Sequence, residues 1–227
     1  MINIGDYAFY GCTSLTGITI PDGVTSVGFQ TFSGCISLKE IAIPDSVKSI
    51  ENNAFYGCAN LTEVVIPNSV TRIYSGAFYK CTSLIEMTIP DSVTYIGECA
   101  FCGCTNLKKI VVPDSITSIG GSTFYGCTSL TEITIPDGVT NIWSSTFRGC
   151  SSLTEITIPD SITYIGEGAF FQCKKLKDVY YTGSQKKWGK LQTNAAVDFI
   201  TWVAAATIHC TDGDILPTAE NSITTGT

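Results

Sequence analysis

Residues 127–147 read CTSLTEITIPDGVTNIWSSTF, and nearly the same pattern returns every 23 residues along most of the chain. The cysteine that opens the pattern belongs to a series without insertion or deletion: Cys12, Cys35, Cys58, Cys81, Cys104, Cys127, Cys150 and Cys173. A phenylalanine three residues before each cysteine and a leucine three residues after it keep the same period. A fixed period of this length is typical of a solenoid, in which each repeat is one structural unit stacked on the next.

One repeat predicts one short strand followed by a turn. Residues 130–135, LTEITI, place apolar side chains among Glu and Thr, as a strand with one buried face does. Pro136 ends the strand because proline has no N–H for a sheet ladder, and Asp137 and Gly138 supply turn chemistry. Val139 then brings an apolar side chain back to the interior. A single helical or 3₁₀ turn is expected to bury the phenylalanine and cysteine that follow.

No single repeat of this kind buries its own Leu, Ile, Val and Phe side chains. Stability must therefore come from stacking, with each apolar position forming a column along the solenoid. Parallel strands lie roughly 4.8 Å apart, so eight coils predict a slab on the order of 35 to 40 Å long.

The consensus L-x-x-I-x-I-P-[DN]-[SG]-[VI]-T-x-I-G-x-x-[AT]-F-x-x-C resembles the BspA-like, treponemal-type leucine-rich repeat, over residues 4–181. The resemblance implies a leucine-rich repeat solenoid with a parallel β-sheet on the concave face and short 3₁₀ or turn segments on the convex side. Departures are local: Met87 replaces a strand Ile, Glu51, Tyr74 and Trp143 replace a Gly, and Lys80 and Gln172 replace the Gly before Cys. Met87 is an apolar replacement of similar size, which a core tolerates.

The domain organisation predicted from this pattern has three parts. Residues 1–181 form the solenoid of eight repeats, the first of them partial because the sequence enters in mid-repeat at Met1. Residues 182–210 form a capping segment, with a short amphipathic helix bearing Trp188 and Leu191 and with Phe199 and Trp202 closing the last coil. Residues 211–227 are expected to be a flexible tail. The N-terminal end is expected to be uncapped, so either upstream sequence is missing or another chain covers it.

The segment ECAFCGC, residues 98–104, raises the question of a metal or redox site. Cys104 belongs to the repeat's cysteine series, Cys102 occupies a slot otherwise held by aromatic residues, and Cys99 occupies a slot that varies between repeats. A structural zinc site needs four ligands, and a Cys99–Cys102 disulfide or redox pair needs a lowered thiol pKa. Sequence drift at two tolerant positions is favoured over both alternatives. The eight in-phase cysteines are predicted to be buried thiols, because parallel Cβ atoms about 4.8 Å apart are too distant for disulfides.

Several function classes are not supported by the composition and motifs. A formal net charge of -7 disfavours nucleic acid as a partner. The longest apolar run, from Ala195, contains Asp198 and is too short to span a bilayer, and no signal peptide is recognisable. His209 is the only histidine and lies outside the repeats, without the oriented base and nucleophile that covalent catalysis needs. We therefore expect no enzymatic activity, no cofactor and no metal.

The outward side chains of the strands are the candidate binding residues on the concave face. One row is mostly acidic and the next is mostly Thr: Glu40, Glu63, Glu86, Lys109, Glu132, Glu155 and Asp178, and beside them Thr88, Thr134, Thr157 and Tyr180. Closely spaced carboxylates repel one another, and a basic partner or bound cations would relieve that repulsion. The alternative is that these carboxylates are simply solvated and partly neutralised by Lys39, Lys108 and Lys177. The tyrosines of the convex side are interpreted mainly as packing residues, with an aromatic contact surface as the alternative: Tyr10, Tyr56, Tyr79 and Tyr125.

Two non-catalytic functions remain. The resemblance implies a bacterial cell-surface or secreted interaction module, because BspA-like proteins are associated with adhesion to host proteins and other cells. The alternative is a structural, assembly or recognition component, for example virion or tail-associated, that self-associates through its open N-terminal end. Both functions predict a protein partner and no membrane insertion.

Overall fold

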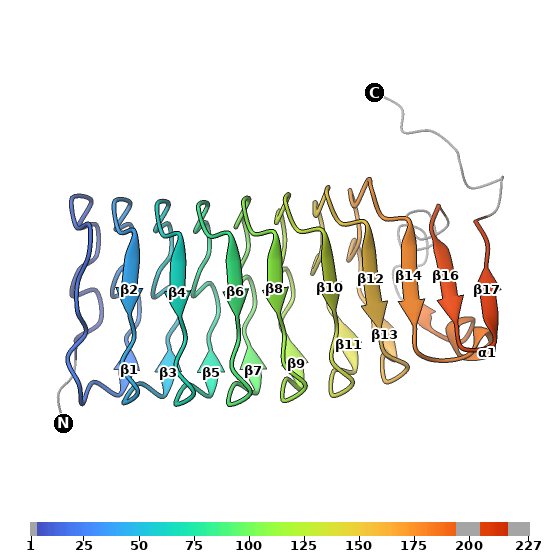
Figure 1. Cartoon of the computed structure of the whole chain (residues 1–227), viewed down its shortest axis with the longest axis horizontal. Coiled ribbons are helices and arrows are strands. Elements are labelled where there is room, and N and C mark those ends of the chain that lie inside the picture. Colours follow the sequence, from blue (N-terminus) through green and yellow to red (C-terminus); the bar gives the residue numbers. More distant parts are fainter. Residues whose placement is uncertain (1–3, 194–204, 218–227) are drawn as a thin grey trace.

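The computed structural model describes residues 4–193 and 205–217 and forms an elongated solenoid whose coils stack side by side from N- to C-terminus (Figure 1). One face of the solenoid carries the longer strands. These are β2 (Glu40–Ala42), β4 (Glu63–Val65), β6 (Glu86–Thr88), β8 (Lys109–Val111), β10 (Glu132–Thr134), β12 (Glu155–Ile158) and β14 (Asp178–Tyr181). Their pairings are parallel and shifted by one repeat, as for Glu40 with Glu63 and Glu132 with Glu155.

Each repeat also contains a second, two-residue strand, where the sequence predicts only one strand. These are β1 (Ser26–Val27), β3 (Ser49–Ile50), β5 (Arg72–Ile73), β7 (Tyr95–Ile96), β9 (Ser118–Ile119), β11 (Asn141–Ile142) and β13 (Tyr164–Ile165). They pair in parallel after the chain has turned at the Pro-Asp dipeptide, and the second residue of each is buried. The apolar residues after the turn therefore do more than return to the core, since they belong to two further narrow sheets, one of β1, β3, β5, β7 and β9 and one that contains β11 and β13.

The segment from phenylalanine to cysteine is a chain of turns rather than a helical or 3₁₀ turn. In one coil the amide of Cys102 donates to the carbonyl of Cys99, and that of Cys104 donates to Phe101, while the amides of Phe101 and Gly103 donate to the following coil. The slot that Cys99 occupies is left-handed in every coil, with φ between 50° and 64°, and so is the slot before each repeat cysteine. A right-handed turn is incompatible with these angles, and glycine is favoured there because it has no Cβ to clash.

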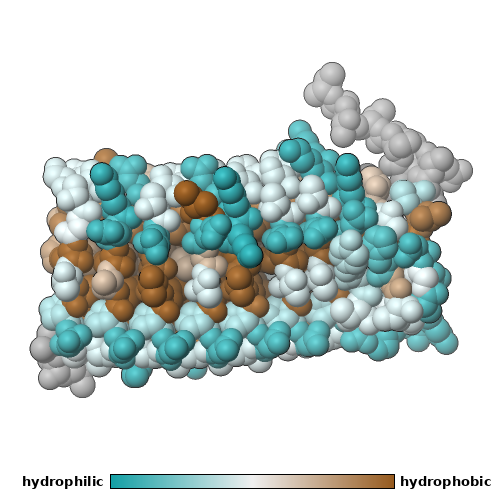
Figure 2. All heavy atoms as spheres, viewed as in Figure 1, coloured by the Kyte–Doolittle hydropathy of each residue, from teal (hydrophilic) through white to brown (hydrophobic). Residues whose placement is uncertain are grey.

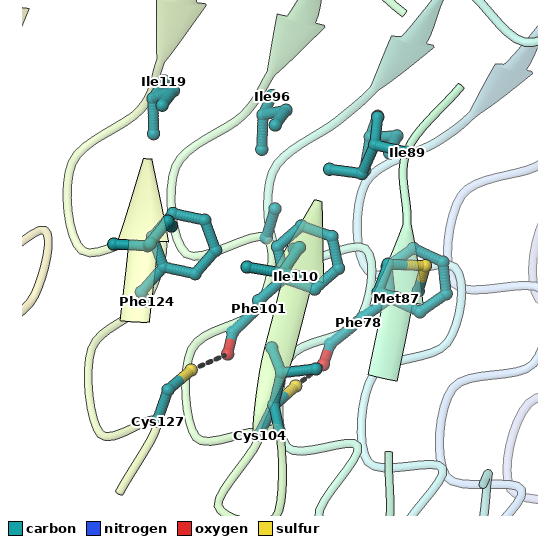
Figure 3. Close-up of a cluster of buried hydrophobic side chains, with 14 of the residues drawn as sticks. Phe78, Met87, Ile89, Ile96, Phe101, Cys104, Ile110, Ile119, Phe124 and Cys127 are labelled. Atoms are coloured by element: carbon teal, nitrogen blue, oxygen red, sulfur yellow. Dashed lines mark hydrogen bonds between the residues drawn. The ribbon is translucent and has the colours of Figure 1, made fainter. Parts of the chain in front are cut away.

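The core is a set of columns parallel to the solenoid axis. The phenylalanine rings stack from Phe9 to Phe170 with centroids 5.3 to 5.9 Å apart and interplanar angles of 3° to 13°. Figure 3 shows three of these rings with the isoleucines that surround them. Met87 is 3% exposed and lies in the core, at the position that isoleucine or valine holds in other coils.

Seven of the eight repeat cysteines are buried thiols, as predicted, from Cys35 to Cys173, whereas the prediction is wrong for Cys12, which is exposed in the first coil because no preceding coil covers it. Each of the seven buried Sγ atoms donates to the carbonyl oxygen of the phenylalanine in the preceding coil, as Cys104 does to Phe78 and Cys127 does to Phe101 (Figure 3), at 3.0 to 3.2 Å. All eleven cysteines are free, so the alternative of a disulfide framework is absent from the structure. The thiol therefore serves as a small apolar side chain with one weak donor.

The C-terminal end continues the sheet beyond the last repeat. The helix α1 (Gln185–Trp188) begins at the N-cap Ser184, and β15 (Gln192–Thr193) pairs with β13. β16 (Thr207–Cys210) then pairs in parallel with β14, and β17 (Gly213–Ile215) pairs antiparallel with β16. The sequence predicts a flexible tail from residue 211, whereas the described residues form a sheet strand there. Phe199 and Trp202, the residues expected to close the last coil, lie outside the described residues.

Candidate functional site

The parallel register brings the acidic residues of successive repeats together in one row. Glu86 of β6 lies opposite Lys109 of β8, and Glu155 of β12 lies opposite Glu132 and Asp178. We call this set the glutamate row: Glu40, Glu63, Glu86, Lys109, Glu132, Glu155 and Asp178. Its members point away from the core, because the strands alternate outward, inward and outward side chains. The surface formed by these outward side chains is called the strand face below.

A second outward row, the central column, runs beside the glutamate row. It includes the predicted Thr88, Thr134, Thr157 and Tyr180, and also Ala42, Val65 and Val111. Val65 is 66% exposed and Val111 is 46% exposed, although each lies in the middle of the strand face. Figure 2 shows the result as an apolar band along this face with hydrophilic residues on both sides.

A third row lies on the other side of the band and is missing from the set of residues selected from the sequence. It consists of the residue after each repeat proline, and all its members are exposed: Asp22, Asp45, Asn68, Asp91, Asp114, Asp137 and Asp160. We call it the aspartate row. The dipeptide of proline and Asp or Asn repeats as regularly as the cysteine does. The sequence therefore contains the periodicity of this row, although the dipeptide taken alone indicates only a turn.

Shallow grooves lie over the strand face. The first, over β4, β6 and β8, measures about 700 Å³ and is lined by Glu63, Glu86, Val65, Val111 and Asp91 among others. A second groove of about 670 Å³ lies over β2 and β4, and a third of about 270 Å³ lies over β8, β10 and β12. The first groove thus reaches from the glutamate row across the central column to the aspartate row.

The carboxylates of the two rows are mostly unpaired. In the part of the chain that the structure describes, the ion pairs join Lys187 to Asp160 and His209 to Asp178 and Asp214. None of these involves the glutamates of the glutamate row or the lysines beside them. The negative charge of the strand face therefore remains available to a partner.

His209 is held between two carboxylates, although the sequence places it alone outside the repeats. Its Nε2 lies 3.0 Å from Oδ1 of Asp178 on β14, and its Nδ1 lies 3.0 Å from Oδ1 of Asp214 on β17. The ring also stacks on Tyr180 with centroids 4.8 Å apart. The hydrogen bond to Asp178, followed by that to Asp214, raises the pKa of His209. Only the protonated imidazole donates hydrogen bonds from both nitrogens. In that form His209 of β16 links β14 to β17 through Asp178 and Asp214.

Cys99 and Cys102 are free thiols. Burial raises the pKa of Cys102 to about 11, and burial also raises the pKa of Cys99. Raised thiol pKa values are the opposite of what a redox pair requires. Among the described residues, no group of three or more His, Cys, Asp or Glu side chains is arranged to hold a metal ion. Sequence drift remains the simplest account of both cysteines.

The convex aromatic series packs mainly against itself. Tyr56 and Tyr79 stack with centroids 5.0 Å apart, and the Arg148 guanidinium lies 4.6 Å from the ring centroid of Phe171 and 5.9 Å from that of Tyr125. The edges of Tyr56 and Tyr125 are still exposed. These contacts favour the packing interpretation for the series.

Comparison with known proteins identifies the repeat. A family model described as the BspA type leucine-rich repeat region, in six copies, matches residues 2–104 and 71–192. The chain belongs to the BspA type leucine-rich repeat family. Leucine-rich repeat domains of this family generally serve as scaffolds that bind protein partners.

Three solved structures of bacterial proteins are similar to this chain. A leucine-rich repeat protein from Bacteroides ovatus is 32% identical, with a TM-score of 0.70, over 85% of this BspA-type chain and 54% of its own. A leucine-rich cell surface protein from Faecalibacterium prausnitzii is 31% identical, with a TM-score of 0.58, over 86% of this chain and 73% of its own. A leucine-rich repeat protein from T. pallidum is 27% identical, with a TM-score of 0.56, over 86% and 79% respectively.

The BspA-type chain spans about half the length of the Bacteroides ovatus protein. No curated protein matches the chain. Within the described residues, no helix has the length and apolar character needed to cross a membrane.

Proposed function

We propose that this chain is a non-catalytic binding module that acts at the bacterial cell surface or in secreted form, in adhesion to host proteins or to proteins of other cells. The observation that carries the proposal is the strand face, where exposed Val65 and Val111 lie beside a row of glutamates without ion pairs. Solenoid repeats use such extended faces to bind partners. The similar protein from Faecalibacterium prausnitzii is described as a cell surface protein, which supports the location.

The absence of catalysis in this proposal rests on chemistry. Both nitrogens of His209 lie beside carboxylates, so neither is directed at a nucleophile. The strand face offers regular rows of outward carboxylates rather than the enclosed pair of carboxyl groups in different surroundings that acid–base chemistry requires.

The test is a charge reversal on the strand face. Glu63, Glu86 and Glu132 are replaced together by lysine, and adhesion is measured with the purified chain on immobilised host-cell surface proteins and on intact cells. The control reverses Glu98 and Glu167, which are exposed in the turn segments after β7 and β13.

We expect the triple variant to lose binding and the control variant to keep it, and added salt to weaken binding by the unchanged chain. Circular dichroism of each variant checks that the solenoid is intact. Full binding by a folded triple variant would contradict a strand-face site and move the contact to the convex or terminal surfaces.

A further inference from the structure

We infer that the partner segment recognised by the strand face is a cationic amphipathic α-helix, lying along the solenoid axis across the strands. This inference rests on the proposed function, because it assumes that the strand face is the binding surface, and it adds the class of partner. It is argued from the apolar floor of the groove, the charges on its two rims, and the spacing of both.

The floor of the groove over β4, β6 and β8 carries two exposed valines where the helix would lie. Val65, Thr88 and Val111 are neighbours in the central column and all line this groove. The exposed fractions of the two valines, 66% and 46%, leave about half or more of the surface of each in contact with water in the unbound chain. Covering that surface with apolar side chains is favourable, so the occupant needs an apolar stripe along its contact face.

The rims of the same groove are acidic on both sides. Glu63 and Glu86 line one side and Asp91 lines the other, and these three carboxylates take part in no ion pair within residues 4–193 and 205–217. A segment that lies between the two rows must carry positive charge on both flanks of its apolar stripe. A helix with apolar residues on one face and Lys or Arg on both sides has this arrangement.

The spacing of the strands selects a helix over an extended chain. Neighbouring parallel strands lie roughly 4.8 Å apart, so Val65 and Val111, two strands apart, lie roughly 9.6 Å apart. Seven helical residues advance about 10.5 Å and one helical turn about 5.4 Å, close to two strands and one strand respectively. An extended chain repeats the same face every 6.8 Å or so and would lose register by about 2 Å at each strand.

The width of the groove is also compatible with a helix. Asp91 lies five positions after Glu86 in the chain, which is at most about 17 Å of extended backbone. An α-helix with its side chains is about 10 to 12 Å across. Lysine or arginine side chains on both flanks therefore reach carboxylates on both rims.

The experiment uses a labelled peptide of roughly 18 residues, built of Leu and Lys in the helical pattern, which spans about 27 Å and crosses about five strands. Binding to the full chain is followed by fluorescence anisotropy. Two control peptides keep the composition and charge: one has central residues exchanged for proline, and one alternates Leu and Lys in a strand pattern. Circular dichroism measures whether the helical peptide gains helix content on binding.

The matched protein variants use residues that the repeat already tolerates. Val65→Thr with Val111→Thr copies the Thr of the same column, and Asp91→Asn with Asp114→Asn copies Asn68. The control pair Glu98→Gln and Glu167→Gln removes two exposed charges from the turn segments.

We expect each strand-face pair to weaken binding of the helical peptide by about tenfold, and the control pair to change it by less than about twofold. We expect the proline peptide and the alternating peptide to bind at least about tenfold more weakly than the helical peptide. Equal binding of the three peptides would overturn the helix and indicate an extended or merely cationic ligand. Unchanged binding by the valine variant would show that charge alone attracts the peptide and would equally overturn it.

Failure of this inference is distinguishable from failure of the proposed function. If the peptide does not bind while the triple glutamate variant still loses adhesion, the helix is wrong and the strand face remains the site. If the triple variant keeps adhesion, the proposed site is wrong, whatever the peptide does.

Discussion

Truncation of Phe101 to alanine tests whether the stacked core carries the stability of the solenoid. Phe101 is fully buried, and its ring stacks on Phe78 at 5.5 Å and on Phe124 at 5.9 Å with interplanar angles of 3° and 5°. Phe9 is the comparison, because it is only partly buried and stacks on Phe32 at 5.3 Å.

The two truncations should differ by about a factor of two. Replacing a buried phenylalanine by alanine costs about 3 to 5 kcal/mol, which includes the cavity left behind. Each aromatic pair adds about 0.5 to 1.5 kcal/mol beyond burial, so the loss of two neighbours puts Phe101→Ala near the upper end. Phe9→Ala removes one such pair and less buried surface, so we expect a loss of about 2 kcal/mol.

The free energy of unfolding is measured by urea denaturation, followed by far-ultraviolet circular dichroism. Long repeat arrays do not always unfold in one step, so the slopes of the transitions are compared before the midpoints are converted to free energies. Phe101→Leu is the control that keeps most of the buried apolar surface but loses both ring stacks, so it should cost about 1 to 3 kcal/mol, less than Phe101→Ala. A loss below about 1.5 kcal/mol for Phe101→Ala, or equal losses at Phe101 and Phe9, would refute the stacked-core explanation.

Three further outcomes follow from the described contacts. Because the pKa of His209 is raised, its contribution to stability should be complete below a pH of about 6.5 and lost as the pH rises through the folded-state pKa. Thermal melts of the His209→Gln variant should lack this pH dependence. Identical pH profiles for the two proteins would contradict a stabilising contact between His209 and the two aspartates. Lys80 has a left-handed backbone at φ 56°, so Lys80→Gly should raise the free energy of unfolding by about 1 kcal/mol. Gly103 occupies the same slot at φ 73°, so Gly103→Ala should lower the free energy of unfolding by about 1 to 2 kcal/mol. Urea melts that show the reverse order would exclude backbone strain as the cause. Burial raises the pKa of Cys58 to about 12, so a thiol reagent at pH 8 should label the exposed Cys12 long before Cys58. Labelling is measured by mass spectrometry. Equal labelling of the two cysteines in the folded chain would show that burial does not protect Cys58 from the reagent.

The acidic rows illustrate how far the sequence predicts the site. The glutamate row follows from the repeat alone, because parallel stacking in register places equal positions beside one another. The aspartate row has the same periodicity, but its relation to the glutamate row depends on how the chain bends after the proline. Only the structure places Glu63, Glu86 and Asp91 around one groove.

The left-handed turn residues were harder to predict. The slot of Cys99 holds eight residues of six types, and that variety suggested a tolerant position. In the structure this slot has a positive φ in every coil. The backbone N–H groups of the turn segment alternate between hydrogen bonds within their own coil and hydrogen bonds to the next coil, and the positive φ allows this alternation. Gln30 and Ser145 adopt that geometry without glycine, so the sequence there does not reveal the backbone.

The sequence by itself determined the solenoid, its buried phenylalanine and cysteine columns and its outward acidic row, because each repeat meets copies of itself and one period specifies every contact. The tertiary structure alone decided the end of the array, where that period stops. His209 pairs with Asp178 and Asp214 across separations of 31 and 5 residues, and no repeat relates these positions. Contacts of that kind depend on how unlike segments pack in space.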